Sequence, residues 1–94
     1  KDDIAAEALL FRGKLLTEVN DLSGSLAELR RLTDPEGDFK DFVEYVEPGL
    51  LALGTVYERL TNVAAARDIY TQLLQSLDES IKAEADARLK KLKK

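Results

Sequence analysis

Hydrophobic residues in the first third of the chain recur at helical spacing. Steps of three, four or seven residues relate Ile4, Ala8, Phe11, Leu15, Leu22, Leu26 and Leu29, and this stripe is widened by Leu16 and Val19. Such a period places apolar side chains on one face of a helix, and it predicts a single helix over residues 3–32. Gly24 lies inside this stretch, and Ser25 followed by Glu28 has the spacing of a capping box. A restart of the helix at this point is therefore the alternative.

A turn is predicted where the first stripe ends. The segment TDPEGD, residues 33–38, combines cap-forming Thr and Asp with a proline and a glycine. These residue types start helices and allow the chain to reverse. A second stripe then follows, formed by Phe39, Phe42, Val46, Leu50, Leu53, Tyr57 and Leu60. It predicts a second helix over residues 38–60.

Pro48 lies in the middle of this second helix. A proline inside a helix has no amide to donate and crowds the preceding turn, at a cost of about 3 kcal/mol. Because Val46, Leu50 and Leu53 keep their register across it, the pattern predicts a kink at Pro48 and not the end of the helix. The kink would separate an acidic half from a nearly uncharged half.

A second turn is predicted at Thr61 and Asn62, which are cap-forming residues. The apolar stripe changes phase after them and continues through Ala66, Tyr70, Leu73, Leu77, Ile81, Ala85, Leu89 and Leu92. This stripe predicts a third helix over residues 63–92. Since neither Gly nor Pro forces a stop at the turn, one continuous helix from residue 49 to 92 is the alternative.

Three long helices with short connections predict an up-down-up, all-α three-helix bundle that forms one domain over residues 1–94. Ninety-four residues suffice for one small core. The sequence shows no evident internal repeat. Its longest apolar runs are far shorter than the roughly 20 residues that a membrane span needs.

The chain contains no Cys, His, Trp or Met, and this excludes thiolate nucleophiles, imidazole bases and Cys/His metal sites. In the acidic segment that starts at Asp34, Phe39 and Tyr45 stand where a calcium-binding EF-hand loop requires Gly and Glu. We therefore expect no enzymatic activity, cofactor or bound metal. The absence of cysteine favours an intracellular location, and the KDD start, without an initiator Met, leads us to expect part of a longer protein.

Charge is unevenly distributed along the chain. Asp41, Glu44 and Glu47 recur every three residues, while residues 88–94 contain five basic residues and no acidic one. The acidic residues predict an exposed helical face that could attract a basic partner. The basic end could touch anionic lipid. The net charge of −4 argues against general nucleic-acid binding.

Two segments, FVEYVEPGLLALGTV and AAARDIYTQLLQSLDES, resemble the second and third helices of BAG domains. The likeness rests on Leu50, Leu51, Leu53 and Arg67, whereas Gly54 and Asp68 depart from the family pattern. The resemblance implies a three-helix bundle that binds the nucleotide-binding domain of an Hsp70-type chaperone and promotes nucleotide exchange.

The sequence thus favours a non-enzymatic protein-interaction or scaffold domain that presents helix faces to a partner. The expected partner is another protein, and self-association is possible. Two alternatives are a BAG-like co-chaperone and a peripheral membrane-binding bundle. The candidate partner-contacting residues are Asp41, Glu44, Glu47, Arg67, Arg88 and Lys91.

Overall fold

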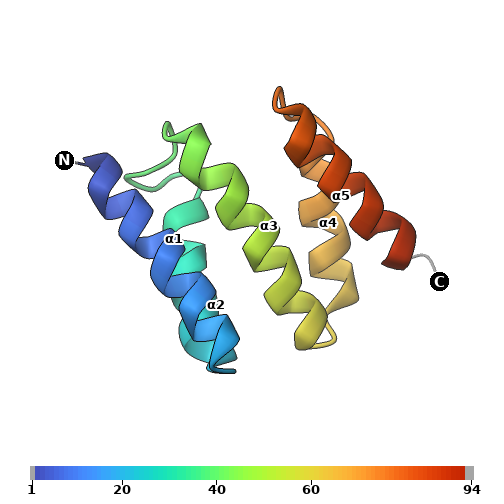
Figure 1. Cartoon of the computed structure of the whole chain (residues 1–94), viewed down its shortest axis with the longest axis horizontal. Helices are drawn as coiled ribbons and strands as arrows, with labels where there is room; N and C mark the ends of the chain where they lie inside the picture. Colours follow the sequence, from blue (N-terminus) through green and yellow to red (C-terminus); the bar gives the residue numbers. More distant parts are fainter. Residues whose placement is uncertain (1, 93–94) are drawn as a thin grey trace.

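Five helices make up the computed structural model, which describes residues 2–92 (Figure 1). They are α1 (Asp2–Glu18), α2 (Leu22–Thr33), α3 (Val43–Arg59), α4 (Val63–Leu73) and α5 (Glu79–Leu92). The all-α class is confirmed. The three-helix count is wrong, because the first and the third predicted helices are each divided into two.

The first predicted helix breaks at Asn20, where φ is 65°. The Asn20 N–H donates to the Thr17 carbonyl at 3.0 Å, and the Asp21 N–H donates to the Leu16 carbonyl at 2.8 Å. This is the Schellman pattern, which places a left-handed residue just past the helix end. Asp21 then caps α2, since its side chain accepts a hydrogen bond from the Gly24 N–H at 3.0 Å. The break therefore comes before Gly24.

The same Schellman hydrogen-bond pattern ends α3. Thr61 has a φ of 61°, its N–H donates to the Glu58 carbonyl at 3.0 Å, and the Asn62 N–H donates to the Tyr57 carbonyl at 2.8 Å. The Asn62 side chain caps α4 by accepting from the Ala65 N–H at 3.2 Å. The predicted turn at Thr61 and Asn62 is confirmed, and the alternative of one continuous helix is excluded.

The third predicted helix breaks at Ser76. Its hydroxyl donates to a Glu47 carboxylate oxygen at 2.6 Å and accepts from the Asp78 N–H at 3.0 Å. Asp78 in turn accepts from the Ser80 N–H at 2.9 Å, as an N-cap does. The two bonds to the Asp78 and Ser80 amides are local and compete with the helical ladder. Leu77, which was expected on the core stripe, is 99% exposed.

The second predicted helix starts at Val43, not at residue 38. Phe39 is only 7% exposed because it packs in a cluster with Ala6, Leu9 and Leu32 at the end of the α1–α2 hairpin. The chain before α3 therefore folds over this end of the hairpin, and Phe39 contributes to the core from a loop.

Pro48 lies inside α3 and does not end it, and the ribbon of α3 is unbroken along its length (Figure 1). The predicted continuity is confirmed, while the kink stays a prediction. Because α3 starts at Val43, only Glu44 and Glu47 of the expected acidic half belong to the helix. The uncharged residues 48–57 form most of the remainder.

The α1–α2 and α3–α4 hairpins repeat one another with a constant offset of 41 residues along the chain. Equivalent pairs are Gly13 and Gly54, Asn20 and Thr61, Asp21 and Asn62, Leu29 and Tyr70, and Leu32 and Leu73. At Gly13 the backbone closely approaches the Leu29 side chain, and at Gly54 it closely approaches the Tyr70 ring. An internal repeat is therefore present that the apolar periodicity did not show, because the equivalent residues share conformation more than identity.

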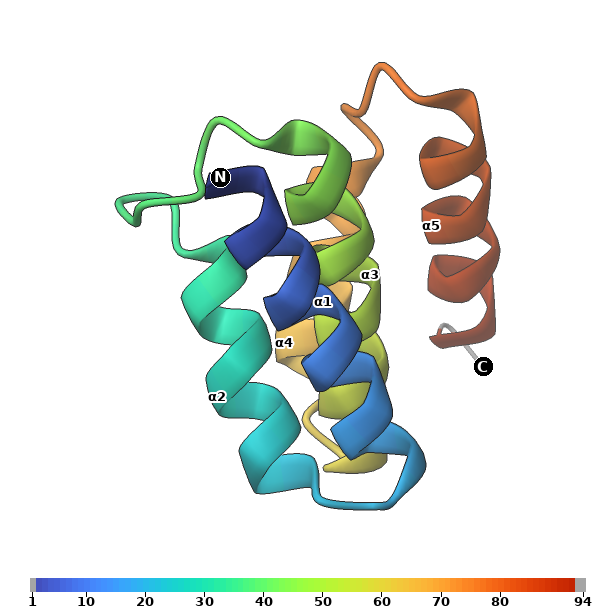
Figure 2. The ribbon, with the colours of Figure 1, turned by 60° about the vertical axis from the view of Figure 1, so that its left-hand side comes forward.

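The central helix is α3, which contacts the other four, whereas α2 and α4 do not contact each other within residues 2–92. In Figure 2 the α1–α2 hairpin lies on one side of α3 and α5 lies on the other. The main core joins Leu29, Leu53, Val56, Tyr70 and Ile81. The radius of gyration is 12.5 Å, close to the roughly 12 Å expected for a compact chain of this length.

The apolar stripe predicted for the first helix faces solvent at its start. Ile4 and Phe11 are each 68% exposed, and Leu15 is 47% exposed. The buried face of α1 is formed instead by Ala6 and Leu9, together with Gly13. The period of this helix was correct, but the face assigned to the core was wrong.

Candidate functional site

Two grooves lie on opposite faces of α3. The larger, here called the α2–α4 groove, has a volume of about 1030 Å³, and its walls come from α2 and α4. The smaller, here called the α1–α5 groove, has a volume of about 510 Å³, and its walls come from α1 and α5. Both use α3 as their floor, because α3 contacts each of the other four described helices.

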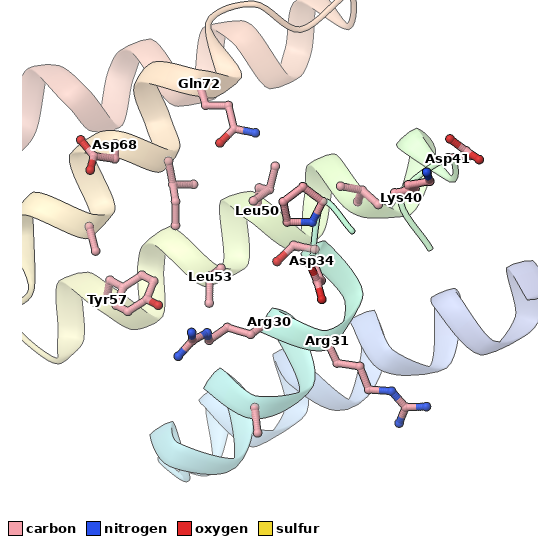
Figure 3. A pocket seen from close by; sticks show the side chains of 16 residues that line it. Arg30, Arg31, Asp34, Lys40, Asp41, Leu50, Leu53, Tyr57, Asp68 and Gln72 are labelled. Carbon is pink, nitrogen blue, oxygen red and sulfur yellow. The ribbon is translucent and has the colours of Figure 1, made fainter. Parts of the chain in front are cut away.

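The floor of the α2–α4 groove is one apolar line along α3, formed by Val46, Leu50, Leu53 and Tyr57. These residues are spaced so that they fall on one face of the helix. Figure 3 shows Leu50, Leu53 and Tyr57 along α3, with Arg30 and Arg31 on one side of this helix and Asp68 and Gln72 on the other.

The two walls of this groove differ in charge, and Asp34 at the C-terminal end of α2 also lines it. Arg30 and Arg31 stand on α2, while Asp68 and Gln72 stand on α4 across the floor (Figure 3). All four side chains are exposed. Among residues 2–92, neither arginine nor Asp68 forms an ion pair or a side-chain hydrogen bond. These charges are therefore free to meet a ligand.

The sequence contains only a weak signal for this groove. Arg30 and Arg31 follow the apolar stripe of the first hairpin, and by themselves they are typical of a helix end that favours cations. Asp68 was noted only as a departure from the BAG pattern. The three charges meet across α3 because the chain forms two hairpins, and a one-dimensional pattern does not show which hairpin faces meet.

The α1–α5 groove has a similar apolar floor, formed by Pro48, Leu51 and Ala52 of α3. On its α5 wall the charges neutralise one another, since the Arg88 Nε donates to a Glu84 carboxylate oxygen at 2.9 Å. This wall therefore offers less unpaired charge than the walls of the α2–α4 groove.

A polar chain beneath the α1–α5 groove links three helices. The Tyr70 hydroxyl of α4 donates a hydrogen bond to the carboxylate of Glu58 on α3. Arg88 of α5 lies with its Nη1 3.9 Å from the same carboxylate. Burial raises the pKa of Tyr70 to about 12, and the hydrogen bond to Glu58 adds to the shift.

This shift predicts a loss of stability at high pH. Below about pH 10 the phenol is neutral in both the folded and the unfolded chain, so its full contribution is present. Between pH 10 and about 12 the unfolded chain ionises first, and stability falls by at most about 1.4 kcal/mol per pH unit. Urea midpoints of the native protein and of Tyr70→Phe, measured across this range, should diverge, because phenylalanine has no proton to lose. A constant difference between the two curves would contradict the burial of this hydroxyl.

The predicted acidic face does not form. Asp41 lies before α3 on the rim of the α2–α4 groove. Glu44 is exposed in the first turn of α3, and Glu47 accepts a hydrogen bond from Ser76. Of the three, only Asp41 lines a groove, because the helix that was expected to align them starts after it.

The predicted basic residues are dispersed as well. Arg67 is exposed on α4, next to Asp68 but outside the groove lining, and Lys91 is exposed on α5. Arg88 lines the α1–α5 groove and is paired with Glu84 and Glu58. The six predicted residues therefore do not gather into one site.

Two further findings bear on the chemistry of the described residues. Within residues 2–92, no three acidic side chains come close enough together to hold a metal ion. None of the helices in this range is both long and apolar enough to cross a membrane.

Comparison of the chain with protein-family models, with curated proteins and with solved structures finds no match.

Proposed function

We propose that this chain is a non-enzymatic interaction domain whose α2–α4 groove binds an amphipathic helix of a partner protein. One observation carries the proposal. The groove has an apolar floor between two walls that differ in charge, and neither Arg30 and Arg31 nor Asp68 is neutralised by other described residues.

The shape of the groove suits a helix. Val46, Leu50, Leu53 and Tyr57 run in one line along α3, and α2 and α4 flank this line without touching each other. A helix lying on α3 with apolar residues at every third or fourth position would fill the space between them. Its side chains would bury the parts of Val46 and Tyr57 that stay half-exposed in the free chain.

The charges on the two walls of the groove determine which residues the flanks of such a helix should carry. An acidic flank would face Arg30 and Arg31, and a basic flank would face Asp68. Complementary charge of this kind mainly sets partner choice and association rate, while the apolar contacts supply most of the affinity.

Three helical peptides with the same apolar stripe test the proposal. The first has Glu on one flank and Lys on the other, the second has Lys on both flanks, and the third has Glu on both. Fluorescence anisotropy should show tightest binding for the mixed peptide. The peptide can lie along α3 in either direction. In both directions one flank faces the arginines and the other faces Asp68, so only a mixed pair of flanks matches both walls.

Arg30→Glu combined with Arg31→Glu makes both walls acidic and should shift the preference from the mixed peptide to the Lys-flanked one. Converting an attractive exposed pair into a repulsive one should change the ratio of dissociation constants by roughly three- to thirtyfold. Lys91→Glu, on α5 and outside the lining of both grooves, is a control charge reversal and should leave the order unchanged. Equal affinities for the three peptides, or an unchanged order in the variant with Glu at both arginine positions, would contradict the proposal.

A second candidate site is the α1–α5 groove, occupied by an extended partner segment. The first helices of the two hairpins, α1 and α3, contact each other, whereas the second helices, α2 and α4, do not. The concave side of the array is therefore formed by α1, α3 and α5. The spacing Leu50-x₂-Leu53-Gly54-x₂-Tyr57, then Ala66-x₃-Tyr70, is similar to that of tetratricopeptide repeats, with leucine in place of the initial tryptophan and tyrosine in place of the phenylalanine. Such repeat arrays bind partners on their concave face. Leu51→Glu should abolish binding at this groove and leave the three-peptide preference intact.

The other functional alternatives have less support. The BAG resemblance implies a three-helix bundle, whereas the matching segments form an α3–α4 hairpin that repeats α1–α2. The basic end is partly neutralised within α5, where Lys90 Nζ lies 3.1 Å from Asp86 Oδ2 and Arg88 bonds Glu84. Neither observation favours a chaperone or a lipid as the ligand.

A further inference from the structure

A row of apolar side chains on α1 lies on the surface, away from both grooves. This α1 stripe consists of Ile4, Ala8, Phe11 and Leu15 of α1 and of Val19 directly after its end, all of them exposed. Ile4, Phe11 and Val19 each expose about two thirds of their surface, at 68%, 68% and 66%. A continuous apolar row of this length on a small domain marks a contact surface.

The internal repeat shows what packs on the equivalent face of α3. The residues of α3 equivalent to Ile4, Ala8 and Leu15 are Tyr45, Gly49 and Val56. Tyr45 packs on the Ala6–Leu9–Leu32 cluster. A Cβ on Gly49 would lie 2.8 Å from Leu32 Cδ2, and Val56 has no exposed surface. At these positions α3 packs against the hairpin that precedes it, while α1 has no helix there.

The other end of the array is closed. The outward face of α5 presents Ala83, Asp86, Ala87 and Lys90, which are exposed and small or charged. Stacked helical arrays need such a polar outer face at their ends. Because only the α1 end is apolar, stacking of copies head to tail would bury the charges of α5 and is disfavoured.

We infer that two copies of this chain pair through the α1 stripe, with the two α1 helices antiparallel about a two-fold axis. An axis passing between residues 9 and 10 sets Ile4 opposite Leu15 of the second copy. It also sets Ala8 opposite Phe11 of the second copy, so the largest side chain meets the smallest. Both pairings occur twice, as two-fold symmetry requires.

The charged residues beside the stripe support the same register. Glu7 and Lys14 are both exposed, and they lie on the same flank of the stripe. In the antiparallel pair, Glu7 of one copy lies about 3 Å along the axis from Lys14 of the other, within reach of a lysine side chain. The pairing therefore sets unlike charges beside each other at both ends of the contact.

The first test is the oligomeric state of the 94-residue chain, measured by sedimentation equilibrium over a concentration series. We expect a dimer with twice the monomer mass of 10.5 kDa. Phe11→Glu should raise the dissociation constant at least about tenfold, because two buried aromatic rings are replaced by two charges. Far-UV circular dichroism should be unchanged, since Phe11 is exposed in the monomer. Ala87→Glu, on the outer face of α5, should leave the dimer intact.

Charge reversal tests the register. Glu7→Lys alone and Lys14→Glu alone should each weaken the dimer by roughly three- to thirtyfold, and the double swap should restore it. The chain has no cysteine, so a single introduced thiol reports on geometry. A short bismaleimide should link Ala8→Cys chains but not Val19→Cys chains, because the antiparallel arrangement places the two Val19 positions about 28 Å apart along the axis.

Three results would overturn the inference: a monomer at every concentration, a Phe11→Glu variant that dimerises as well as the native chain, or efficient linking at Val19→Cys. A monomer at every concentration would mean that a helix other than a second α1 covers the α1 stripe. Efficient linking at Val19→Cys would indicate a parallel pair. Since the α1 stripe lies outside both grooves, none of these results depends on whether the α2–α4 groove binds a peptide.

Discussion

Replacing Tyr70 with alanine should destabilise the domain more than any other single truncation that we consider. We expect the free energy of unfolding to fall by about 3–5 kcal/mol, the range for removing a buried aromatic side chain. Tyr70 has no exposed surface, and it packs in the main core with Val56 and Ile81, which lie on helices at its two sides. The loss would be a large share of the roughly 5–15 kcal/mol that stabilises a typical domain.

Thermal unfolding followed by circular dichroism measures this effect, with an expected decrease in Tm of roughly 15–30 °C. Tyr70→Phe keeps the ring and removes only the hydrogen bond to Glu58, so it should cost about 1 kcal/mol. Tyr57→Ala serves as the matched truncation of a half-buried tyrosine that lines the α2–α4 groove, and it should cost clearly less than Tyr70→Ala. Similar losses for the two alanine variants would contradict the central position of Tyr70.

Gly54→Val should give the second large loss, about 2–3 kcal/mol from overpacking. A Cβ at Gly54 would lie 2.5 Å from Cε1 and 2.7 Å from Cζ of the Tyr70 ring. An aromatic ring is rigid, and this one is fully buried, so either the ring or the α3–α4 packing has to shift. The hydrogen bond from the Tyr70 hydroxyl to Glu58 would be strained by the same movement.

Two further valine variants test whether overpacking causes this loss, since valine has a higher helix propensity than the glycine that it replaces. Ala64→Val changes an exposed position of α4 and should cost only a few tenths of a kcal/mol. Gly13→Val is the equivalent change in the first hairpin, where the added atoms meet the fully buried side chain of Leu29, and it should also cost clearly more than Ala64→Val. Urea unfolding gives all three values, and equal losses for Gly54→Val and Ala64→Val would refute the close approach.

Several features of the fold were correctly predicted from residue pattern alone. The helical class follows from the 3.6-residue period, and the turn at Thr61 and Asn62 follows from their capping side chains. The helix continues through Pro48 because the apolar register on either side of it is maintained. In these cases the deciding interactions are local, within one or two helical turns.

Two breaks were missed for different reasons. At Asn20 the signal was present, since Asn tolerates a left-handed φ and Asp21 can cap, but the uninterrupted apolar spacing favoured one long helix. At Ser76 a hydroxyl bonds a distant carboxylate, Glu47, as well as the nearby Asp78 amide. A bond to a residue far away in the chain leaves no trace in local spacing.

The sequence by itself determined the helical class, the period of each apolar stripe and the absence of thiol and imidazole groups, because these depend on residue type and near neighbours. Only the tertiary structure decided which stripe of α1 is buried, that two hairpins repeat, and that Arg30 and Asp68 face each other across α3. A helical period shows that a face exists but not what covers it. The covering segment is set by packing between parts of the chain that lie far apart in the sequence, and within residues 2–92 no segment covers the exposed stripe of α1.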